Sequence, residues 1–234
     1  MNLKWIFAVL AISALLVPAT LASSLPAKEK YQEPLDKVTF IHYSNGKVKP
    51  TSSAPCFKLM GVKWKMLPVN YVINPSNSGL PVADIVNALS SSAEEWDSRT
   101  SANLFGTYLI NYSAAWDDTA SQVDYTNEYV FGPYPQTNVI AVTNIWYTRY
   151  GKQIVDYDVM FNTYYAWGDG TLNPSLMDLQ NIATHETGHG LGLSDVYNSG
   201  CFAVTMYGYS TEGDIGKRTL EQPDITGLQK MYGI

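Results

Sequence analysis

Apolar residues recur at every third or fourth position in three stretches of the chain, and this spacing predicts helices. The first predicted helix begins at Pro81, and its apolar stripe consists of Val82, Ile85, Val86, Leu89, Ala93 and Trp96. A second is expected to begin at Asn173-Pro174, because Asn caps helices and Pro fits their first position. A third is predicted from about Pro223 to Gly233.

Short runs rich in Val, Ile, Tyr and Trp predict the strands of a sheet. One run, at residues 68–74, lies before the first predicted helix. Three more lie between the first two helices, at residues 105–110, 138–146 and 154–161. Turn-forming residues separate them.

The two N-terminal segments lack the pattern of a folded core. Residues 1–22 combine Lys4, an apolar run that stops at Val17 and small residues around Ala22, which predicts a secretory signal peptide. The run is short for a permanent membrane anchor, which is the alternative interpretation. Residues 23–55 are rich in Lys, Pro and Ser, so they are interpreted as a linker or short pro-segment, and His42 within them as a packing residue.

Composition and charge narrow the class of protein. Hydrophobic residues make up 46% of the chain and charged residues 15%, so residues 56–234 can bury one core. Residues 23–55 hold five lysines against three acidic residues, whereas the rest after residue 55 holds nine basic and eighteen acidic residues. Because an acidic body repels nucleic acid, we expect no nucleic-acid partner. We also expect a secreted, extracellular monomer without a permanent membrane anchor.

The chain has two cysteines, Cys56 and Cys201. In an exported protein they most simply form one disulfide bond, which closes a long loop and stabilises the fold by about 4 to 5 kcal/mol in the loop-entropy model. The alternative is that Cys56 is a free thiolate that inhibits a metal centre.

Residues 185–195, HETGHGLGLSD, carry the candidate chemistry. On a helix, His185 and His189 project from the same side, so both imidazoles can bind one zinc ion. Glu186 is offset by one position and can act as general base for zinc-activated water. Because two of the three histidines of the chain have this spacing, an accidental match in an ordinary helix is the weaker interpretation.

A catalytic zinc normally takes three protein ligands, and no third histidine lies in the motif. Gly190 and Gly192 allow the chain to leave the helix and turn back toward the metal, where Asp195 would arrive as the third ligand. The alternative is that Asp195 is a surface residue of a turn.

These residues resemble the metzincin zinc proteases, in which HExxHxxGxx is followed by His or, in snapalysin-like members, by Asp. The segment 204–210, VTMYGYS, is similar to the Met-turn, with Met206 beneath the metal, and residues 220–233 resemble the closing helix of the matrixins. The resemblance covers roughly residues 60–233. It implies an α+β catalytic domain, in which a twisted mixed sheet carries two long helices and a small C-terminal subdomain holds the Met-turn and the closing helix.

The resemblance also implies how a substrate would bind. A protein or peptide would lie extended along an edge strand, for which residues 154–161 are the candidate. Tyr207, Gly208 and Tyr209 would line the pocket beyond the scissile bond. Structural calcium is common in the family, and Asp156, Asp158 and Asp169 are available but unassigned. This sequence departs from the matrixins in its aspartate ligand, in Gly208 and in lacking a cysteine-switch sequence.

We therefore predict an exported zinc-dependent endopeptidase, with zinc bound by His185, His189 and Asp195 and with Glu186 as general base. The alternative function is a non-catalytic binding or surface module that retains the metal on the same fold. An intact Glu186 favours catalysis, because a purely structural site has no use for a general base. Use of the glycosylation sequon at Asn111 stays open.

Overall fold

The computed structural model describes residues 33–46 and 54–234. The predicted signal peptide, residues 1–22, lies outside the described residues. So do residues 23–32 and 47–53 of the predicted linker or pro-segment.

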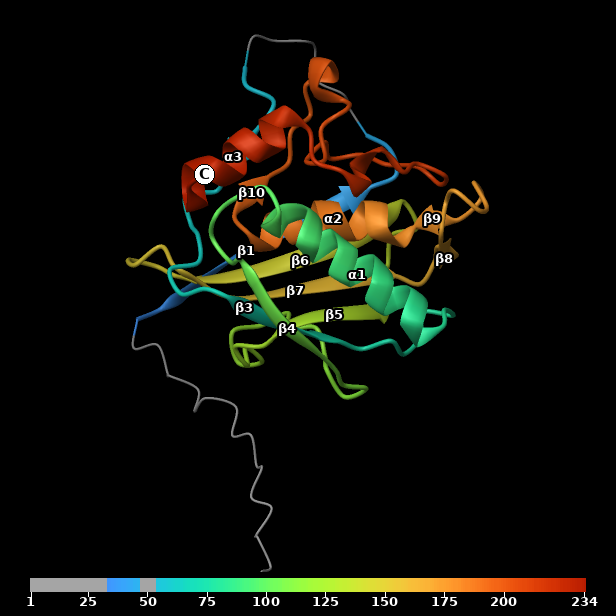
Figure 1. The fold of residues 1–234 in the computed structure, drawn as a ribbon. Helices are drawn as coiled ribbons and strands as arrows, with labels where there is room; N and C mark the ends of the chain where they lie inside the picture. Colours follow the sequence, from blue (N-terminus) through green and yellow to red (C-terminus); the bar gives the residue numbers. More distant parts are fainter. Residues whose placement is uncertain (1–32, 47–53) are drawn as a thin grey trace, which may run out of the picture. The chain divides into compact units, whose positions relative to one another are not determined.

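The described residues form a six-stranded mixed sheet in the order β1-β6-β7-β5-β3-β4 (Figure 1). Its strands are β1 (Leu35–Tyr43), β3 (Val69–Ile73), β4 (Phe105–Ile110), β5 (Asn127–Gly132), β6 (Val139–Thr148) and β7 (Ile154–Asn162). The pairs β3–β4, β3–β5 and β5–β7 are parallel, whereas β6 is antiparallel to both β7 and β1. Two small ladders pair β2 (Lys58–Leu59) with β10 (Leu193–Ser194), and β8 (Trp167–Gly168) with β9 (Met177–Asp178).

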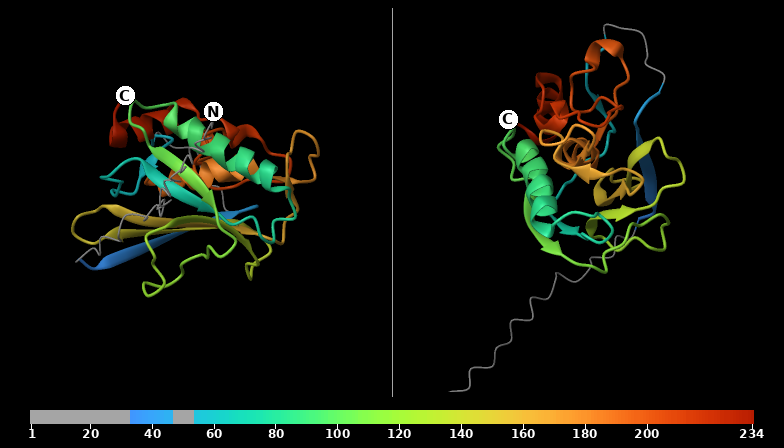
Figure 2. Two further views of the ribbon diagram at one scale, coloured as in Figure 1. Left: turned by 60° about the horizontal axis from the view of Figure 1, so that its bottom comes forward. Right: turned by 90° about the vertical axis from the view of Figure 1, so that its right-hand side faces the viewer.

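Helices α1 (Val82–Asp97) and α2 (Leu179–Gly190) lie on the same face of this sheet (Figure 2). Helix α3 (Gln222–Tyr232) follows two short 3-10 turns, η1 (Ser199–Cys201) and η2 (Gly216–Arg218). The predicted first and third helices and four of the strands are therefore present. The α+β fold class predicted from the sequence is confirmed.

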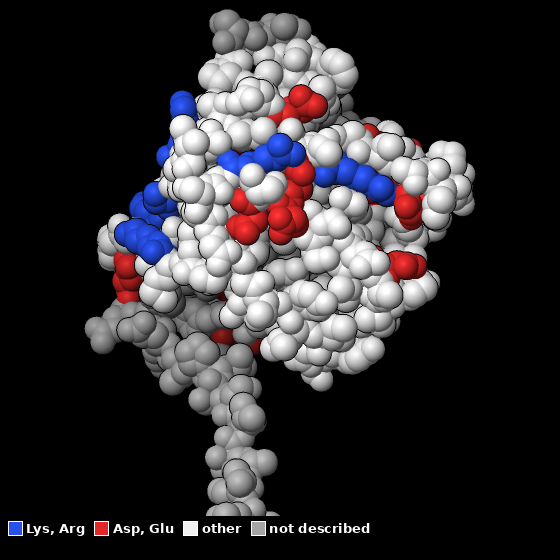
Figure 3. Space-filling view, in the orientation of Figure 1, with Lys and Arg blue, Asp and Glu red and all other residues white. Residues whose placement is uncertain are grey.

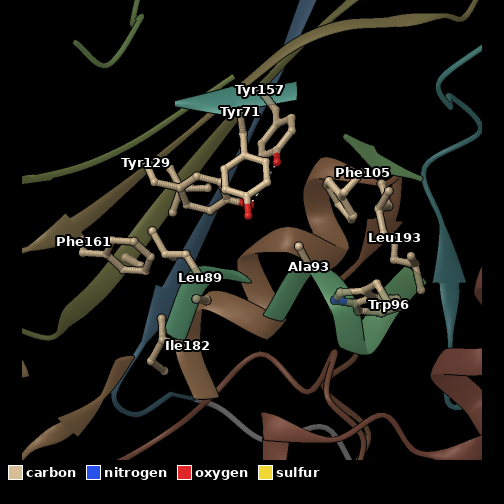
Figure 4. Packing of buried hydrophobic residues seen from close by; sticks show 14 of the residues in the cluster. Tyr71, Leu89, Ala93, Trp96, Phe105, Tyr129, Tyr157, Phe161, Ile182 and Leu193 are labelled. Atoms are coloured by element: carbon tan, nitrogen blue, oxygen red, sulfur yellow. Dashed lines mark hydrogen bonds between the residues drawn. The ribbon is translucent and has the colours of Figure 1, made fainter. Parts of the chain in front are cut away.

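The core lies between the sheet and the two long helices (Figure 4). The predicted stripe of α1 supplies Leu89, Ala93 and Trp96, which are almost fully buried. Two polar tips in this core are paired, as is usual for buried polar groups. The Trp96 indole donates to the Thr184 carbonyl of α2 at 2.8 Å, and the Tyr129 hydroxyl lies 2.8 Å from that of Thr187. These bonds fix α2 against both neighbours.

Helix α2 begins at Leu179, later than the predicted start at Asn173-Pro174, which was wrong. Asp178 is the N-cap, and its side chain accepts a hydrogen bond from the Asn181 amide. Asn173 instead accepts from the Ser175 amide at 3.0 Å, which closes a local turn. A helix cap and a turn both use a side-chain oxygen that accepts a hydrogen bond from a nearby backbone amide. Here Asn173 closes a turn and Asp178 starts the helix.

Part of the segment interpreted as a linker is a strand of the sheet. Residues Leu35–Tyr43 form β1, which pairs along β6 from Leu35 opposite Thr148 to Tyr43 opposite Val139. Residues 35–43 therefore belong to the folded sheet, and the interpretation of residues 23–55 as a linker or short pro-segment stays a prediction. Strand β5, which lies at the centre of the sheet, was also missed by the sequence pattern.

Cys56 and Cys201 form a disulfide bond, as predicted. It joins positions separated by 145 residues and ties the start of the domain to η1. The alternative of a free Cys56 thiolate on a metal is excluded by this bond.

On the face shown in Figure 3, acidic side chains gather near the middle and Lys and Arg side chains lie to either side. Several opposite charges form close pairs, among them Arg99 with Glu95 at 2.6 Å. No helix among residues 33–46 and 54–234 has the length and apolar character needed to cross a bilayer.

Candidate metal and catalytic site

Helix α2 brings the two motif histidines together. His185 and His189 lie one turn apart, are buried, and their Nε2 atoms approach to 3.1 Å. The Nδ1 atom of His185 lies 2.7 Å from the Thr205 carbonyl, and that of His189 lies 2.9 Å from the Leu193 carbonyl. Because a carbonyl oxygen only accepts hydrogen bonds, each Nδ1 carries a proton and donates it. Both Nε2 lone pairs then point into one small space.

The chain after α2 turns back as the glycines predict. The helix ends at Gly190, and Gly192 has a φ of +104°, in the region that favours glycine. A Cβ atom at Gly192 would also lie 2.4 Å from the Val62 carbonyl oxygen, so a side chain there is excluded. The turn leads through β10 to Asp195.

Asp195 lies at the two imidazoles and is 9% exposed. Its Oδ1 atom is 3.1 Å from His185 Nε2 and 3.4 Å from His189 Nε2. The other carboxylate oxygen, Oδ2, accepts a hydrogen bond from the Tyr197 hydroxyl at 3.0 Å. Within the described parts of the chain, Oδ1 has no further hydrogen-bond partner.

The spacing of these three donor atoms fits a zinc ion. With zinc–ligand bonds of about 2.0 to 2.1 Å, two ligands in a tetrahedron lie about 3.3 Å apart. The three separations here are 3.1, 3.1 and 3.4 Å. The two imidazoles also hold their outer N–H groups on carbonyl oxygens, which orients metal-binding histidines. Ligation by His185, His189 and Asp195 stays a prediction, and the geometry suits it.

The electrostatics of Asp195 and His185 agree with a cation centre. Burial alone would raise the pKa of Asp195, but His189 and His185 outweigh burial and hold that pKa well below its ordinary value. Burial, together with the Lys217 charge, lowers the pKa of His185 to about 4. At neutral pH the Asp195 carboxylate is therefore ionised, and the neutral His185 ring has a lone pair on Nε2 that can bind a metal ion.

Glu186 is held beside this centre by two side chains. The Thr143 hydroxyl of β6 donates to Oε2 at 2.5 Å, and His42 Nδ1 lies 3.1 Å from Oε1. Burial raises the pKa of Glu186 to about 7, although the His189 charge and the Thr143 hydrogen bond act in the opposite direction. A carboxyl group with a pKa near neutrality can both accept and return a proton at physiological pH.

Met206 is fully buried below α2. A Cβ atom at Gly188 would lie 2.4 Å from the Met206 sulfur, so glycine lets the methionine pack directly against the helix. The next residues, predicted to line a substrate pocket, run beside β1. Tyr209 forms a parallel bridge with Tyr43, and the Ser210 amide donates to the Tyr43 carbonyl at 3.3 Å.

Two residues of β1 reach the centre and were missed by sequence reasoning. The Phe40 ring stacks on His189, with centroids 3.9 Å apart and planes 5° apart. The buried His42 ring lies 4.0 Å from that of His185. His42 is therefore not merely a packing residue of a linker. The signal that could have found them is the alternation of Val38, Phe40 and His42, which puts all three on one face of a strand.

The predicted peptide-binding edge must be corrected. Residues 154–161 lie in β7, between β6 and β5, so β7 is an interior strand. The strand that contacts the site is β6, through Thr143, and β1 pairs along its outer edge as the end strand of the sheet. A hollow of about 830 Å³ lies beside β1 and is bordered by residues 194–198 on its other side.

A second acidic group lies on β5, β7 and the loop before β5. Asp117, Asp124 and Asp156 offer oxygens within 4.8 Å of one another, as do Glu128, Asp156 and Asp158. Asp156 Oδ1 and Glu128 Oε2 are buried without a hydrogen-bond partner among the described residues. Burial raises the pKa of Glu128 to about 11 and that of Asp158 to about 7.

The fold and the site together define a class of protein, a metallopeptidase domain with two histidines and a glutamate on one buried helix. The chain belongs to the matrixin family, because the family model described as Matrixin matches residues 63–233. The resemblance found in the sequence is confirmed by this match.

Two known proteins are similar to this chain. Karilysin from Tannerella forsythia is 25% identical over 191 residues, which cover 82% of this chain and 37% of karilysin. Metalloendoproteinase 1 from Glycine max is 42% identical over 71 residues, which cover 30% of this chain and 22% of that protein. The match thus spans only about a third of the length of karilysin and about a fifth of the length of metalloendoproteinase 1.

Asp195→Asn is expected to weaken zinc binding by more than the roughly 10- to 100-fold that loss of an outer-shell partner costs. The amide removes the negative charge at Oδ1. Zinc affinity is measured by competition with a chromophoric chelator. Asp214→Asn, which changes an aspartate of the C-terminal part, is the control. Equal affinity of Asp195→Asn and the native chain would remove Asp195 from the ligand set.

Asp156→Asn is expected to stabilise the chelator-treated protein more at pH 8 than at pH 5. Burial, followed by the charges of Asp158 and Asp117, raises the pKa of Asp156 well above its ordinary value. The native state therefore holds a proton that the unfolded chain releases above about pH 4, so stability falls as pH rises through this interval. Urea unfolding should show the variant gaining about 1 to 3 kcal/mol over this range. Asp118→Asn, an exposed neighbour, is the control, and parallel pH profiles would contradict the expectation.

Proposed function

We propose that this matrixin is an exported zinc endopeptidase that hydrolyses peptide bonds in proteins or peptides. The observation that carries the proposal is the convergence of two imidazole nitrogens and a carboxylate oxygen within 3.4 Å, with Glu186 beside them. A purely structural metal site would close the fourth position with another protein ligand. Here the neighbouring group is instead a carboxylate held for proton transfer.

The residues of the site would have two separate roles, metal binding and proton transfer. His185, His189 and Asp195 would hold the ion. When bound, zinc supplies Lewis acidity, which polarises a peptide carbonyl and lowers the pKa of water to about 7. Glu186 accepts a proton from the attacking water and delivers it to the leaving amine. The Thr143 hydrogen bond at 2.5 Å fixes Oε2, and Oε1, which lies 3.1 Å from His42 Nδ1 in this form, would face the reacting groups once β1 is released.

The substrate would lie extended along β6. An antiparallel strand there gains main-chain hydrogen bonds along the whole edge, which is binding by β-augmentation. The nine residues of β1 already use this edge, and their ladder supports β6 as the peptide-binding strand. Tyr207, Gly208 and Tyr209 would border the same peptide on its other side, as Tyr209 borders Tyr43 in β1.

Residues 23–55 are then best interpreted as a pro-segment that keeps the chain latent. Phe40 and His42 point at the metal centre from the strand that occupies the substrate edge. Latency of this kind needs no cysteine, in agreement with Cys56 being in a disulfide bond. Export, with a signal peptide at residues 1–22, is supported by the same bond, because disulfides persist in oxidising compartments.

Structural calcium stays a prediction of the family resemblance. Asp156 and Asp158 lie in a buried group of oxygens, which is the ligand type that calcium prefers. Asp169 pairs with Arg218 at 2.6 Å and is not part of that group.

One observation favours the alternative, a non-catalytic module that retains the metal. The proposed substrate edge is filled by β1, so the chain in this form is closed to a peptide. The two functions differ in whether release of β1 produces Glu186-dependent cleavage.

Glu186→Ala is expected to abolish casein cleavage, with a loss of at least about 100-fold, because the proton acceptor is removed. Zinc content should stay at the native value, because Glu186 is not a proposed ligand. Both are measured on the zinc-loaded chain, with Glu94→Ala on α1 as the control. Equal, negligible cleavage by every form, including chains in which β1 is destabilised, would support the non-catalytic module.

Phe40→Lys is expected to raise the initial rate of casein cleavage about 10- to 100-fold. The change removes an apolar ring from His189 and places an ammonium beside a cationic centre, which shifts β1 toward its released form. Thr39→Lys is the matched control, because it adds the same side chain on the other face of the strand. Unchanged or lower activity of Phe40→Lys, with zinc retained, would argue against β1 as the latency segment.

A further inference from the structure

His42 occupies a site built from three separate elements. Its ring comes from β1, Glu186 of α2 lies on one edge, and Lys217 of η2 lies on the other. Nδ1 is 3.1 Å from Glu186 Oε1, and Nε2 is 3.2 Å from the Lys217 ammonium nitrogen. Lys217 is only 3% exposed and is not one of the proposed zinc ligands.

The lysine determines which nitrogen of His42 donates a hydrogen bond and which accepts one. An ammonium group has three donors and no acceptor, so His42 Nε2 must accept. The proton of the neutral ring therefore lies on Nδ1, which donates to Glu186. The site thus presents one donor and one acceptor to whatever side chain enters between them.

Lys217 is held rigidly in this position. Its backbone amide donates to Asn181 Oδ1 of α2 at 2.6 Å, and its ammonium also donates to the Tyr207 carbonyl. A buried ammonium loses its hydration and must recover hydrogen bonds from the protein. His42 supplies one of them, so an occupant without an acceptor leaves that donor unsatisfied.

Resting on the peptidase function proposed above, we propose that Lys217 is a specificity-determining residue, which selects peptides carrying a hydrogen-bond acceptor on the side chain that replaces His42. The occupants that fit are a neutral histidine or the amide of glutamine or asparagine, whereas a carboxylate would lie against the Glu186 carboxylate with no proton to donate. Leucine and isoleucine offer no acceptor, and lysine or arginine would place a second cation against the ammonium. The amide fits best after histidine, because it can also donate to Glu186.

The first test measures how stably β1 is paired to the sheet, and it does not depend on catalysis. Hydrogen exchange of the β1 amides is followed in the full chain, treated with a chelator so that it cannot hydrolyse peptides. His42→Gln and His42→Leu are compared in the native and in the Lys217→Met background. In the native background we expect at least tenfold faster exchange for His42→Leu than for His42→Gln. In Lys217→Met this ratio should fall below about threefold, because an unsatisfied donor is no longer buried.

Controls separate recognition from loss of structure. Lys63→Met removes another lysine that donates to a backbone carbonyl, that of Met231 at 2.6 Å, and should keep the native ratio. Exchange of β5 and β7 amides reports the fold in every variant. If Lys217→Met does not fold, Lys217→Gln takes its place with the same criterion. Equal ratios with and without Lys217 would overturn the proposal and leave the lysine a structural residue.

The second test uses peptides with the sequence of residues 35–46 and His, Gln, Glu, Leu or Lys at the position of His42. Cleavage is measured with the zinc-loaded full chain carrying Phe40→Lys, with and without Lys217→Met. We expect His and Gln peptides to be cleaved at least tenfold faster than Glu, Leu or Lys peptides, and the preference over Leu peptides to disappear without Lys217. Cleavage without preference would overturn the specificity proposal alone. No cleavage of any peptide, with the exchange coupling intact, would overturn the peptidase function and leave Lys217 as the residue that recognises His42.

Discussion

The site depends on one electrostatic constraint, the enforced approach of two imidazole lone pairs and a carboxylate oxygen. Carbonyl oxygens of Thr205 and Leu193 fix the tautomers of His185 and His189, so neither ring can turn its N–H inward without losing a buried bond. Asp195 is tied by Tyr197 and cannot withdraw without breaking that contact. A bound cation, as proposed for zinc, would resolve the conflict, and the matrixin domain supplies the rigid frame that maintains it.

That frame is the packing of α2 between α1 and the sheet. Trp96, Tyr129 and Tyr157 surround the helix with large apolar surfaces, and their polar tips bond to one another or to α2. Glycine at position 188 allows Met206 to approach from below. Because cores of this density resist small displacements, the donor atoms keep separations near those of a tetrahedral site.

The zinc motif could be predicted from the sequence because its parts are local. His185, Glu186 and His189 share one helix, and the glycines that return the chain to Asp195 follow at once. The same holds for α1, whose stripe is periodic over its whole length. The prediction of where α2 starts was wrong because Asn173 and Asp178 can both cap a helix. Only the surrounding packing selects between them.

The contacts of β1 could not be predicted in this way, because they join residues far apart in the chain. His42 contacts Glu186, 144 residues away in the sequence, and Lys217, 175 residues away. A pattern read from neighbouring residues cannot predict such contacts. The sequence predicts two of the three histidines as ligands and the third, His42, as a packing residue. The fold instead puts the third beside the proposed general base, a placement set by the register of β1 on β6.

That register connects stability with function. A bare β6 edge would expose a row of unpaired N–H and C=O groups, which is both an aggregation hazard and the surface that an extended peptide needs. The chain covers this edge with its own strand, and the groups that a substrate would use are the ones that hold β1. Any occupant that displaces β1 must therefore replace its main-chain ladder, its apolar contact on His189 and its acceptor at Lys217. The first requirement is met by any extended peptide, so discrimination between peptides falls to the two side-chain positions.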